Sequence, residues 1–255
     1  MSGKQPFPVA GKRVLVTGGT AGLGFAMARA LLEGGARLAI TGRDEERGGA
    51  AERNLRSFGD CLFLRHDAAE EASWAEVLDT VRHRLGGLDA VINNVGVNEV
   101  RPIALTSYAD FLRLARINLH SAWLGTYRGG ALIADSGGGA VVNIGSMAAR
   151  YAHPQVAPYC TAKAMVAGLS KAAARHFEAR GVRVNTIHPG IFLTELTERT
   201  AFSDDAARAA QIARIPAARF GDPAELGPLA LFLVSEASQG LTGSEFVADG
   251  GRTAW

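Results

Sequence analysis

The chain has 255 residues, of which 47% are hydrophobic and 20% are charged, and its formal net charge is +2. This composition is typical of a globular protein with a substantial core and excludes a disordered or fibrous chain. The small net charge, without a dense Lys/Arg stripe, argues against nucleic acid or an anionic membrane as a partner and favours a small molecule.

The N-terminal stretch lacks the apolar region of a signal peptide, and no apolar run approaches the roughly 18 residues that span a bilayer. We therefore expect a cytoplasmic protein. Cys61 and Cys160 are far apart and belong to no Cys/His cluster, and the six histidines lack metal-binding spacing. The sequence predicts neither a disulfide framework nor a metal site.

Short apolar runs begin near residues 13, 37, 61, 89, 140, 182 and 245, and longer helical stretches separate them. Such alternation predicts a doubly wound α/β fold, in which helices cover both faces of a mostly parallel sheet. No linker or repeat interrupts the pattern. We expect one domain over residues 1–255, with a long substrate-covering loop at about 191–215.

The first apolar run leads into TGGTAGLG at residues 17–24, whose glycines Gly18, Gly22 and Gly24 follow a GxxxGxG spacing. A glycine-rich turn between the first strand and its helix is where backbone N–H groups can receive a pyrophosphate. The strict GxGxxG fingerprint is absent, so an ordinary strand-to-helix turn remains an alternative.

The second apolar run ends in AITGRDEER, where an acidic residue would bind a ribose hydroxyl and an arginine would bind a 2′-phosphate. Thr41 and Gly42 occupy the acidic position and Arg43 follows, which favours NADP(H). Arg43 could instead begin a solvated helix face, and Asp44 leaves NAD(H) possible.

Tyr159 and Lys163, in YCTAK, have the i, i+4 spacing that places both side chains on one helix face. An ammonium beside a phenol lowers the phenol's pKa and makes it a usable acid or base near neutral pH. Ser146 ends the run AVVNIGS thirteen positions earlier, at the carboxyl edge of a predicted strand, where open α/β sheets bind ligands.

At this point the chain resembles the short-chain dehydrogenase/reductase family in its single-domain form. The resemblance is carried by TGGTAGLG at 17–24, NNVG at 93–96, Asn118, Ser146, the Tyr159/Lys163 pair, HPGIFLT at 188–194 and ADGG at 248–251. It implies a Rossmann-like fold and a transfer of hydride between a nicotinamide cofactor and a ketone or secondary alcohol.

By the same resemblance, Tyr159 exchanges a proton with the carbonyl oxygen while Ser146 hydrogen-bonds that oxygen. Lys163 binds the nicotinamide ribose and tunes Tyr159, and Asn118 holds a water that relays protons to Lys163. Donors aimed at the oxygen suit a reaction in which it gains negative charge, while the cofactor carries the hydride.

The resemblance also implies which residues hold the cofactor, from its phosphates through adenine and ribose to the carboxamide. They are Gly18, Thr20, Gly22, Leu23, Gly24, Arg43, Asp67, Ala68, Asn94, Gly96, Tyr159, Lys163, Pro189, Phe192 and Thr194. Two positions depart from the family pattern: Val95 replaces the usual alanine, and Gly145 precedes Ser146 where a second serine is common. Neither change removes a reacting group.

Substrate choice is expected to depend on residues 97–103, 147–156 and 191–215. Their apolar side chains favour a largely apolar, uncharged substrate: Tyr151, Val156, Phe192, Leu193, Leu196 and Phe202. A ketoacyl-acyl-carrier-protein reductase remains an alternative, which the basic residues Lys171, Arg175, Arg180 and Arg183 permit. A non-catalytic dinucleotide-sensing protein is a further alternative, against which the intact catalytic residues argue.

The helix after Tyr159 is rich in small residues, which suggests that it is buried on more than one side and packs against a second subunit. Family members are commonly tetramers built on this helix, so we expect a homo-oligomer. His153 is a candidate substrate contact because of its position, and His188, before Pro189, is interpreted as a structural residue.

Overall fold

The computed structural model describes residues 7–200 and 204–254. Seven strands form one sheet in the order β3-β2-β1-β4-β5-β6-β7, and every neighbouring pair is parallel. The strands are β1 (Arg13–Thr17), β2 (Arg37–Gly42), β3 (Cys61–Arg65), β4 (Ala90–Asn93), β5 (Gly139–Ile144), β6 (Val182–Pro189) and β7 (Glu245–Ala248). The predicted doubly wound α/β fold is confirmed.

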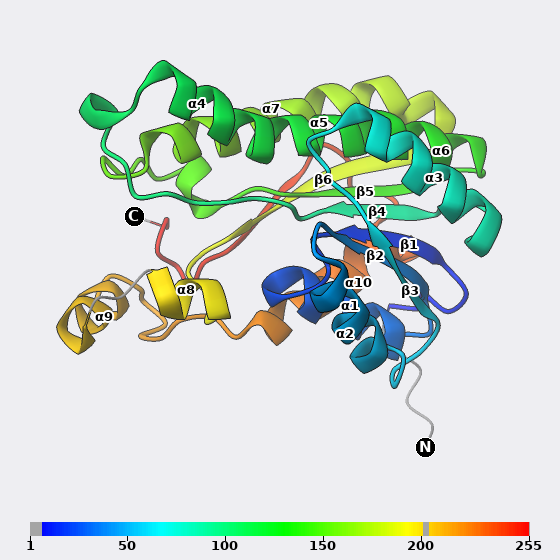
Figure 1. The fold of residues 1–255 in the computed structure, drawn as a ribbon, viewed down its shortest axis with the longest axis horizontal. Helices are drawn as coiled ribbons and strands as arrows, with labels where there is room; N and C mark the ends of the chain where they lie inside the picture. Colours follow the sequence, from blue (N-terminus) through cyan, green and yellow to red (C-terminus); the bar gives the residue numbers. More distant parts are fainter. Residues whose placement is uncertain (1–6, 201–203, 255) are drawn as a thin grey trace.

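Helices cover both faces of the sheet (Figure 1). The α-helices are α1 (Gly22–Glu33), α2 (Glu45–Leu55), α3 (Glu71–Leu85), α4 (Tyr108–Ala115), α5 (Ser121–Leu124), α6 (Gly130–Asp135), α7 (Ala157–Phe177), α8 (Glu195–Thr200), α9 (Asp205–Ile212) and α10 (Leu226–Val234). Two π-helical turns, Arg116–His120 and Gly125–Gly129, join α4, α5 and α6. Short 3-10 turns occur at Ile103–Leu105, Met147–Ala149, Glu178–Arg180, Pro223–Glu225 and Glu236–Ser238.

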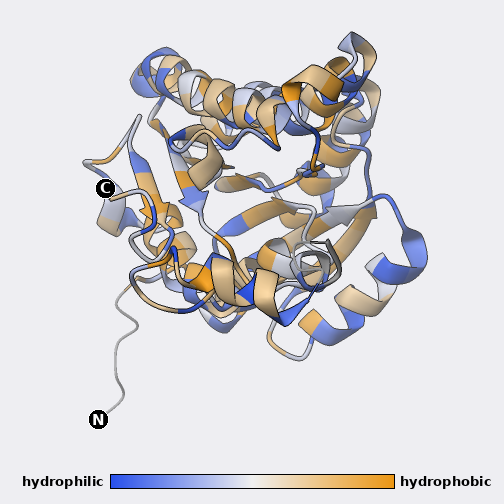
Figure 2. Ribbon diagram, turned by 90° about the vertical axis from the view of Figure 1, so that its left-hand side faces the viewer, coloured by the Kyte–Doolittle hydropathy of each residue, from blue (hydrophilic) through white to orange (hydrophobic). Residues whose placement is uncertain are grey.

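Two apolar clusters fill the space between the sheet and its helices. Helices α1, α2 and α10 pack on one face, and α3, α6 and α7 pack on the other. Because both faces are covered, the strands are nearly continuous apolar runs, and Figure 2 shows hydrophobic colour concentrated between the helical layers. Burial on both faces thus explains why strand residues such as Leu15 and Val16 are both fully buried.

The strand order reverses at β1, because β2 pairs with one side of it and β4 with the other. The chain therefore leaves β1 and β4 toward opposite faces of the sheet, which opens a crevice at their carboxyl ends. The predicted substrate loop, 191–215, contains α8 and α9 and extends beyond this edge (Figure 1). Residues 201–203 of that loop, including Phe202, lie outside the described residues.

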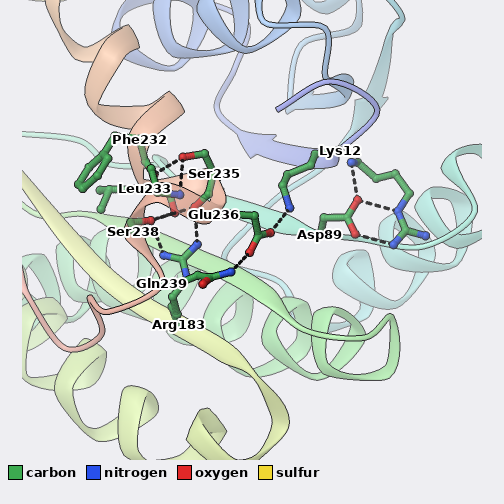
Figure 3. A network of polar contacts seen from close by, with 11 residues as sticks. Lys12, Asp89, Arg183, Phe232, Leu233, Ser235, Glu236, Ser238 and Gln239 are labelled. Atoms are coloured by element: carbon green, nitrogen blue, oxygen red, sulfur yellow. Dashed lines mark hydrogen bonds and ion pairs between the residues drawn. The ribbon is translucent and has the colours of Figure 1, made fainter. Parts of the chain in front are cut away.

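The opposite, amino edge of the sheet is closed by polar contacts, several of which Figure 3 shows. Asp89, before β4, forms a two-pronged ion pair with the Arg13 guanidinium at 2.6 and 2.8 Å and accepts the Arg13 backbone N–H at 2.7 Å. Lys12 pairs with Glu236 at 2.7 Å, and Arg183 donates to Ser238 at 2.7 Å. These contacts bind the starts of β1, β4 and β6 to the end of α10.

Within the described residues, no helix is both long and apolar enough to cross a membrane. Among these residues, no three or more His, Cys, Asp or Glu side chains form a group that could hold a metal ion.

Asp89→Asn is expected to lower the free energy of unfolding at pH 7 by about 1–2 kcal/mol, because it weakens a partly exposed, charge-assisted pair. Partial burial raises the pKa of Asp89, but the hydrogen bonds from Arg13 outweigh burial and lower it overall. The stabilisation is therefore present above an unfolded aspartate's pKa of about 3.9 and is lost as pH falls through the lower folded value. Urea denaturation from pH 7 to pH 3 measures the difference.

Asp60→Asn is the matched control, because Asp60 forms a more exposed pair with Arg37 at 2.8 Å. It should cost less than about 0.5 kcal/mol. Equal costs for the two variants would contradict the special role of the Arg13–Asp89 pair.

Candidate active site

The glycine-rich turn after β1 brings its backbone close to α1 and to the end of β4. Gly18 and Gly22 have φ of 64° and 55°, which favours glycine. A Cβ on Gly24 would lie 2.4 Å from the Gly18 carbonyl oxygen, so this position admits no side chain. Helix α1 begins at Gly22 without a side-chain cap, which leaves N–H groups at its positive end able to receive an anion.

Asn94, directly after β4, holds this turn in place. Its side-chain nitrogen lies 3.1 Å from the carbonyl oxygens of both Thr17 and Gly18. The buried Thr17 hydroxyl accepts the Asn94 backbone N–H at 3.0 Å. The Asn94 carboxamide thus shapes the glycine turn, and sequence reasoning did not single out Thr17, whose hydroxyl joins the two strand ends.

The segment after β6 covers the same turn. A Cβ on Gly22 would lie 3.4 Å from the Thr194 methyl carbon, which places Thr194 beside the start of α1. Phe192 is buried, and Pro189 ends β6 opposite Ala248. Leu23 packs on the core beneath α1, and the Thr20 side chain lies against Gly42 at the end of β2.

Arg43 and Asp44 follow β2 and have different surroundings. Asp44 caps α2 by accepting the Arg47 backbone N–H at 3.0 Å, so its carboxylate is engaged within the chain. Arg43 is exposed and makes no hydrogen bond or ion pair among the described residues. Its guanidinium can therefore meet an anion at the end of β2.

The loop after β3 carries Asp67 and Ala68. Asp67 accepts the Ala69 backbone N–H at 3.0 Å, and the Ala68 carbonyl accepts the Trp74 indole N–H at 2.9 Å. These bonds fix the loop at the edge of the crevice beside β2.

Ser146 and Tyr159 meet on the other side of the crevice. Ser146 lies two residues after β5, and Tyr159 lies in the first turn of α7. The Ser146 hydroxyl is close enough to the phenol to lower its pKa, and it accepts the Ala148 backbone N–H at 3.1 Å. The spacing predicted from sequence thus brings the phenol and the hydroxyl to one point.

Lys163 lies one turn further along α7 and is 3% exposed. Its ammonium donates to the Ile144 carbonyl oxygen at 2.9 Å and lies 5.8 Å from the centroid of the Tyr159 ring. Burial lowers the pKa of Lys163 to about 8. The position supports the expected pairing on one helix face.

Lys163 does not decide the pKa of Tyr159 in this arrangement. Burial raises that pKa above its usual value, and the neighbouring Ser146 hydroxyl offsets only part of this effect. The physical reason is that the Lys163 ammonium is bound to Ile144, while desolvation disfavours the phenolate.

Asn118 is fully buried in the π-helical turn after α4. Its carboxamide accepts the Val97 N–H at 3.1 Å and donates to the carbonyl oxygens of Val97 and Leu114 at 2.9 and 3.0 Å. A Cβ on Gly96 would lie 2.8 Å from the Asn118 Oδ1 and 3.0 Å from the Lys163 ammonium. Gly96 therefore allows these two side chains to approach the chain after β4.

Two further contacts were missed by sequence reasoning. His188, interpreted only as structural, lies against the main chain of Ser146. Arg47 of α2 forms an ion pair with Glu195 of α8 at 2.7 Å, which joins α2 to the segment after β6. No spacing in the sequence pairs residues so far apart, and only the folded chain brings them together.

Known proteins resemble this chain over nearly its whole length. A family model described as Enoyl-(Acyl carrier protein) reductase matches residues 18–253. The chain belongs to the short-chain dehydrogenase/reductase family. An NADP-dependent (R)-specific alcohol dehydrogenase of Lentilactobacillus kefiri is 32% identical over 247 residues, covering 96% of this chain and 97% of the relative. A D-threitol dehydrogenase of Mycolicibacterium smegmatis is 37% identical, with 97% and 95% covered.

A solved structure of a short-chain type dehydrogenase/reductase from Mycobacterium marinum has the same fold. The TM-score is 0.89 at 31% identity, and 98% of each chain is covered. As a member of the short-chain dehydrogenase/reductase family with these relatives, the protein is an NAD(P)-dependent oxidoreductase that acts on CH–OH groups.

Proposed function

We propose that this short-chain dehydrogenase/reductase interconverts a ketone and a secondary alcohol, with Tyr159 as the proton donor and acceptor. The observation that carries the proposal is the placement of Ser146 after β5 beside Tyr159 in the first turn of α7, one helical turn from the buried Lys163. Both hydroxyls can donate to a carbonyl oxygen that gains negative charge in the transition state.

Lys163 and Asn118 support this step. A bound carbonyl would replace part of the interaction between Ser146 and Tyr159, while the Lys163 ammonium stabilises negative charge on the phenol oxygen. Asn118 Oδ1 accepts one bond from Val97 and retains a second lone pair, with which it could hold a water near Lys163. One continuous domain, residues 1–255, would carry both the cofactor and the substrate.

The preferred cofactor is NADP(H), with NAD(H) as the alternative. The uncapped start of α1 and its glycine-rich turn fit a pyrophosphate, and the guanidinium of Arg43, which has no partner among the described residues, fits a 2′-phosphate. The name of the Lentilactobacillus kefiri relative, an NADP-dependent enzyme, supports this preference. When bound, the cofactor supplies or accepts the hydride.

The remaining cofactor residues are proposed from their places around the crevice. Gly18, Thr20, Gly22, Leu23, Gly24 and Thr194 would surround the phosphates, Asp67 and Ala68 the adenine, Asn94 and Gly96 the ribose, and Pro189 and Phe192 the carboxamide. The bonds of Asn94 to the glycine turn support an indirect role for its side chain.

We propose a largely apolar, uncharged ketone or alcohol as substrate, in keeping with the apolar side chains of the three predicted substrate segments. Three of the four basic residues that would permit an acyl-carrier protein have close partners within the chain, and the exposed Arg175 lies 4.0 Å from Glu178. Lys171 pairs with Glu245, Arg175 with Glu178 and Arg180 with Asp135, while Arg183 donates to Ser238. This argues against a free basic docking surface and so disfavours the ketoacyl reductase alternative.

We also propose a homo-oligomer. The outer face of α7 exposes the small residues Ala164, Gly168 and Ala172, together with Met165, which is 48% exposed. The neighbouring α5 and the turn after it expose Trp123 and Tyr127. A small-residue helix face beside large apolar side chains suits close packing against another copy, which supports the tetramer implied by the family.

Tyr159→Phe is expected to reduce turnover at least about a hundredfold, because it removes the transferred proton. NADPH binding, followed by nicotinamide fluorescence, should change less than about twofold, since the lost hydroxyl faces the substrate oxygen. Tyr108→Phe, at an exposed tyrosine on α4, is the matched control and should retain turnover. Unchanged turnover in Tyr159→Phe would exclude the proposed mechanism, and a silent wild type with intact binding would favour a dinucleotide sensor.

Arg43→Gln is expected to weaken NADPH binding about tenfold or more and to leave NADH binding within about twofold, because only NADPH carries the 2′-phosphate. Fluorescence titration of both cofactors measures the two affinities. Arg53→Gln, on the exposed surface of α2, is the control for a general loss of positive charge. Tighter NADH binding by the wild type would contradict the assignment of Arg43.

Light scattering at micromolar concentration should give a multiple of the 26.7 kDa chain mass. Gly168→Arg should lower that mass, because a long charged side chain blocks close helix packing. Ala50→Arg, at an exposed position of α2, should leave it unchanged. A monomeric wild type would refute the oligomer.

A further inference from the structure

His188, near the end of β6, is fully buried with its ring between two active-site elements. Its Nδ1 lies 3.2 Å from the Ser146 backbone nitrogen, which donates to it, and 2.9 Å from the Ser146 carbonyl oxygen. Its Nε2 lies 3.0 Å from a carboxylate oxygen of Glu245 on β7. One imidazole thus joins the partly buried carboxylate of Glu245 to the main chain of Ser146.

Glu245 determines which ring nitrogen carries the proton. Its side chain is 15% exposed and pairs with Lys171 of α7 at 2.6 Å and with Arg150 at 3.0 Å. The hydrogen bond from Lys171 is the main cause that lowers the pKa of Glu245, so the group is a carboxylate at neutral pH. When the carboxylate accepts the Nε2–H of His188, Nδ1 accepts the Ser146 N–H at 3.2 Å; a proton on Nδ1 would instead be donated to the Ser146 carbonyl oxygen at 2.9 Å.

Gly145 provides the space that this ring occupies. A Cβ at position 145 would lie 2.5 Å from His188 Nδ1 and 2.7 Å from its Cε1. The departure noted in the sequence, a glycine where family members commonly have serine, therefore belongs together with His188. A side chain at 145 and an imidazole at 188 compete for the same volume.

The main chain of Ser146 also determines where its hydroxyl lies. Ser146 has extended backbone angles and caps the following 3-10 turn, because its Oγ accepts the Ala148 N–H at 3.1 Å. The same hydroxyl is close enough to Tyr159 to lower the pKa of its phenol. Because no flexible bond other than χ1 separates the held main chain from Oγ, His188 restricts the direction in which Oγ can donate.

We propose that His188 is a positioning residue for the reaction, holding the Ser146 main chain through Nδ1 while Glu245 fixes its tautomer through Nε2. The inference rests on the proposed function, because its effect is exerted through the Ser146 hydroxyl. His188 does not touch the reacting atoms. Loss of His188 should therefore lower kcat, because Ser146 stabilises the transition state more than the bound substrate.

Protonation of His188 would change this contact. The charged ring has two N–H donors, so Nδ1 would turn from accepting the Ser146 N–H to donating to the Ser146 carbonyl. Glu245 from β7, Lys171 from α7 and Arg150 after the 3-10 turn are the charged groups around the ring. Burial lowers the pKa of His188, so the neutral form is held at neutral pH and the change is confined to acid.

Two amide variants test the roles of the two ring nitrogens separately. The asparagine amide lies near the position of Nδ1, and the glutamine amide lies near the position of Nε2. His188→Asn keeps an acceptor for Ser146 N–H and should retain kcat within about threefold, and it should lack the acid fall in kcat that His188 causes. His188→Gln keeps the Glu245 contact but not the Ser146 contact, and it should lower kcat about tenfold or more. The NADPH Kd should be unchanged in both.

Glu245→Met provides a second variant that leaves His188 in place. Without the carboxylate, the cations Lys171 and Arg150 disfavour Nε2–H, and kcat should fall although NADPH still binds. Nitrogen-15 NMR of histidine-labelled protein should show protonation of His188 at Nε2 in the wild type and at Nδ1 in this variant. Asn185→Ala, on the same strand with its carboxamide bonded to Leu241 and Ser244, controls for lost stability.

Equal loss of kcat in His188→Asn and His188→Gln, in proportion to loss of folded protein, would overturn the inference and leave a structural role. Wild-type kcat in His188→Gln would overturn it as well, as would an Nδ1–H tautomer in the wild type. Turnover by Tyr159→Phe would instead refute the proposed function. The two failures are therefore distinguishable.

Discussion

The site depends on a buried polar chain that locks α7 to the middle of the sheet. Asn93 of β4 donates to Asn143 of β5 at 2.8 Å, Asn143 donates to Ser170 of α7 at 2.9 Å, and Thr186 of β6 donates to Ser170 at 2.7 Å. A slip or rotation of α7 would leave several of these buried groups unpaired, at a cost of roughly 1–3 kcal/mol each. Because Ser170 lies two turns beyond Lys163 on the same face, this chain also fixes where the catalytic helix presents its side chains.

The same buried polar chain explains how the buried ammonium of Lys163 stays beside Tyr159. Burial disfavours the charged form of Lys163, and among the described residues its ammonium hydrogen-bonds only to the Ile144 carbonyl. Such a group is costly to the fold, and it persists because α7 cannot move away without breaking the polar chain. Stability for this arrangement comes from elsewhere, including the ion pairs at the amino edge of the sheet, which lie away from the crevice. Ion pairs that stabilise the fold thus lie at the amino edge of the sheet, whereas the candidate catalytic residues lie at its carboxyl edge.

Much of the fold could be predicted from the sequence, because continuous apolar runs and glycine-rich turns are visible in short stretches of sequence. The seven predicted strand positions and the convergence of Ser146, Tyr159 and Lys163 follow from period and spacing. The direction of the Tyr159 pKa shift could not be predicted, since it depends on desolvation and on Lys163 turning to Ile144. The π-helical turn around Asn118 and the contact of His188 with Ser146 depend on tertiary packing, which no spacing encodes.

Three glycines at the crevice occur where a neighbouring group leaves no room for a side chain. Gly24 admits the Gly18 carbonyl, Gly96 admits Lys163 and Asn118, and Gly145 admits His188. In each case a neighbouring group occupies the space that a side chain at the glycine would need. A substitution at the glycine or at its neighbour therefore affects the other residue. Gly145, a departure from the family pattern, thus lies against His188 on the neighbouring strand β6. The size of residue 188 is therefore one determinant of which side chain fits at position 145.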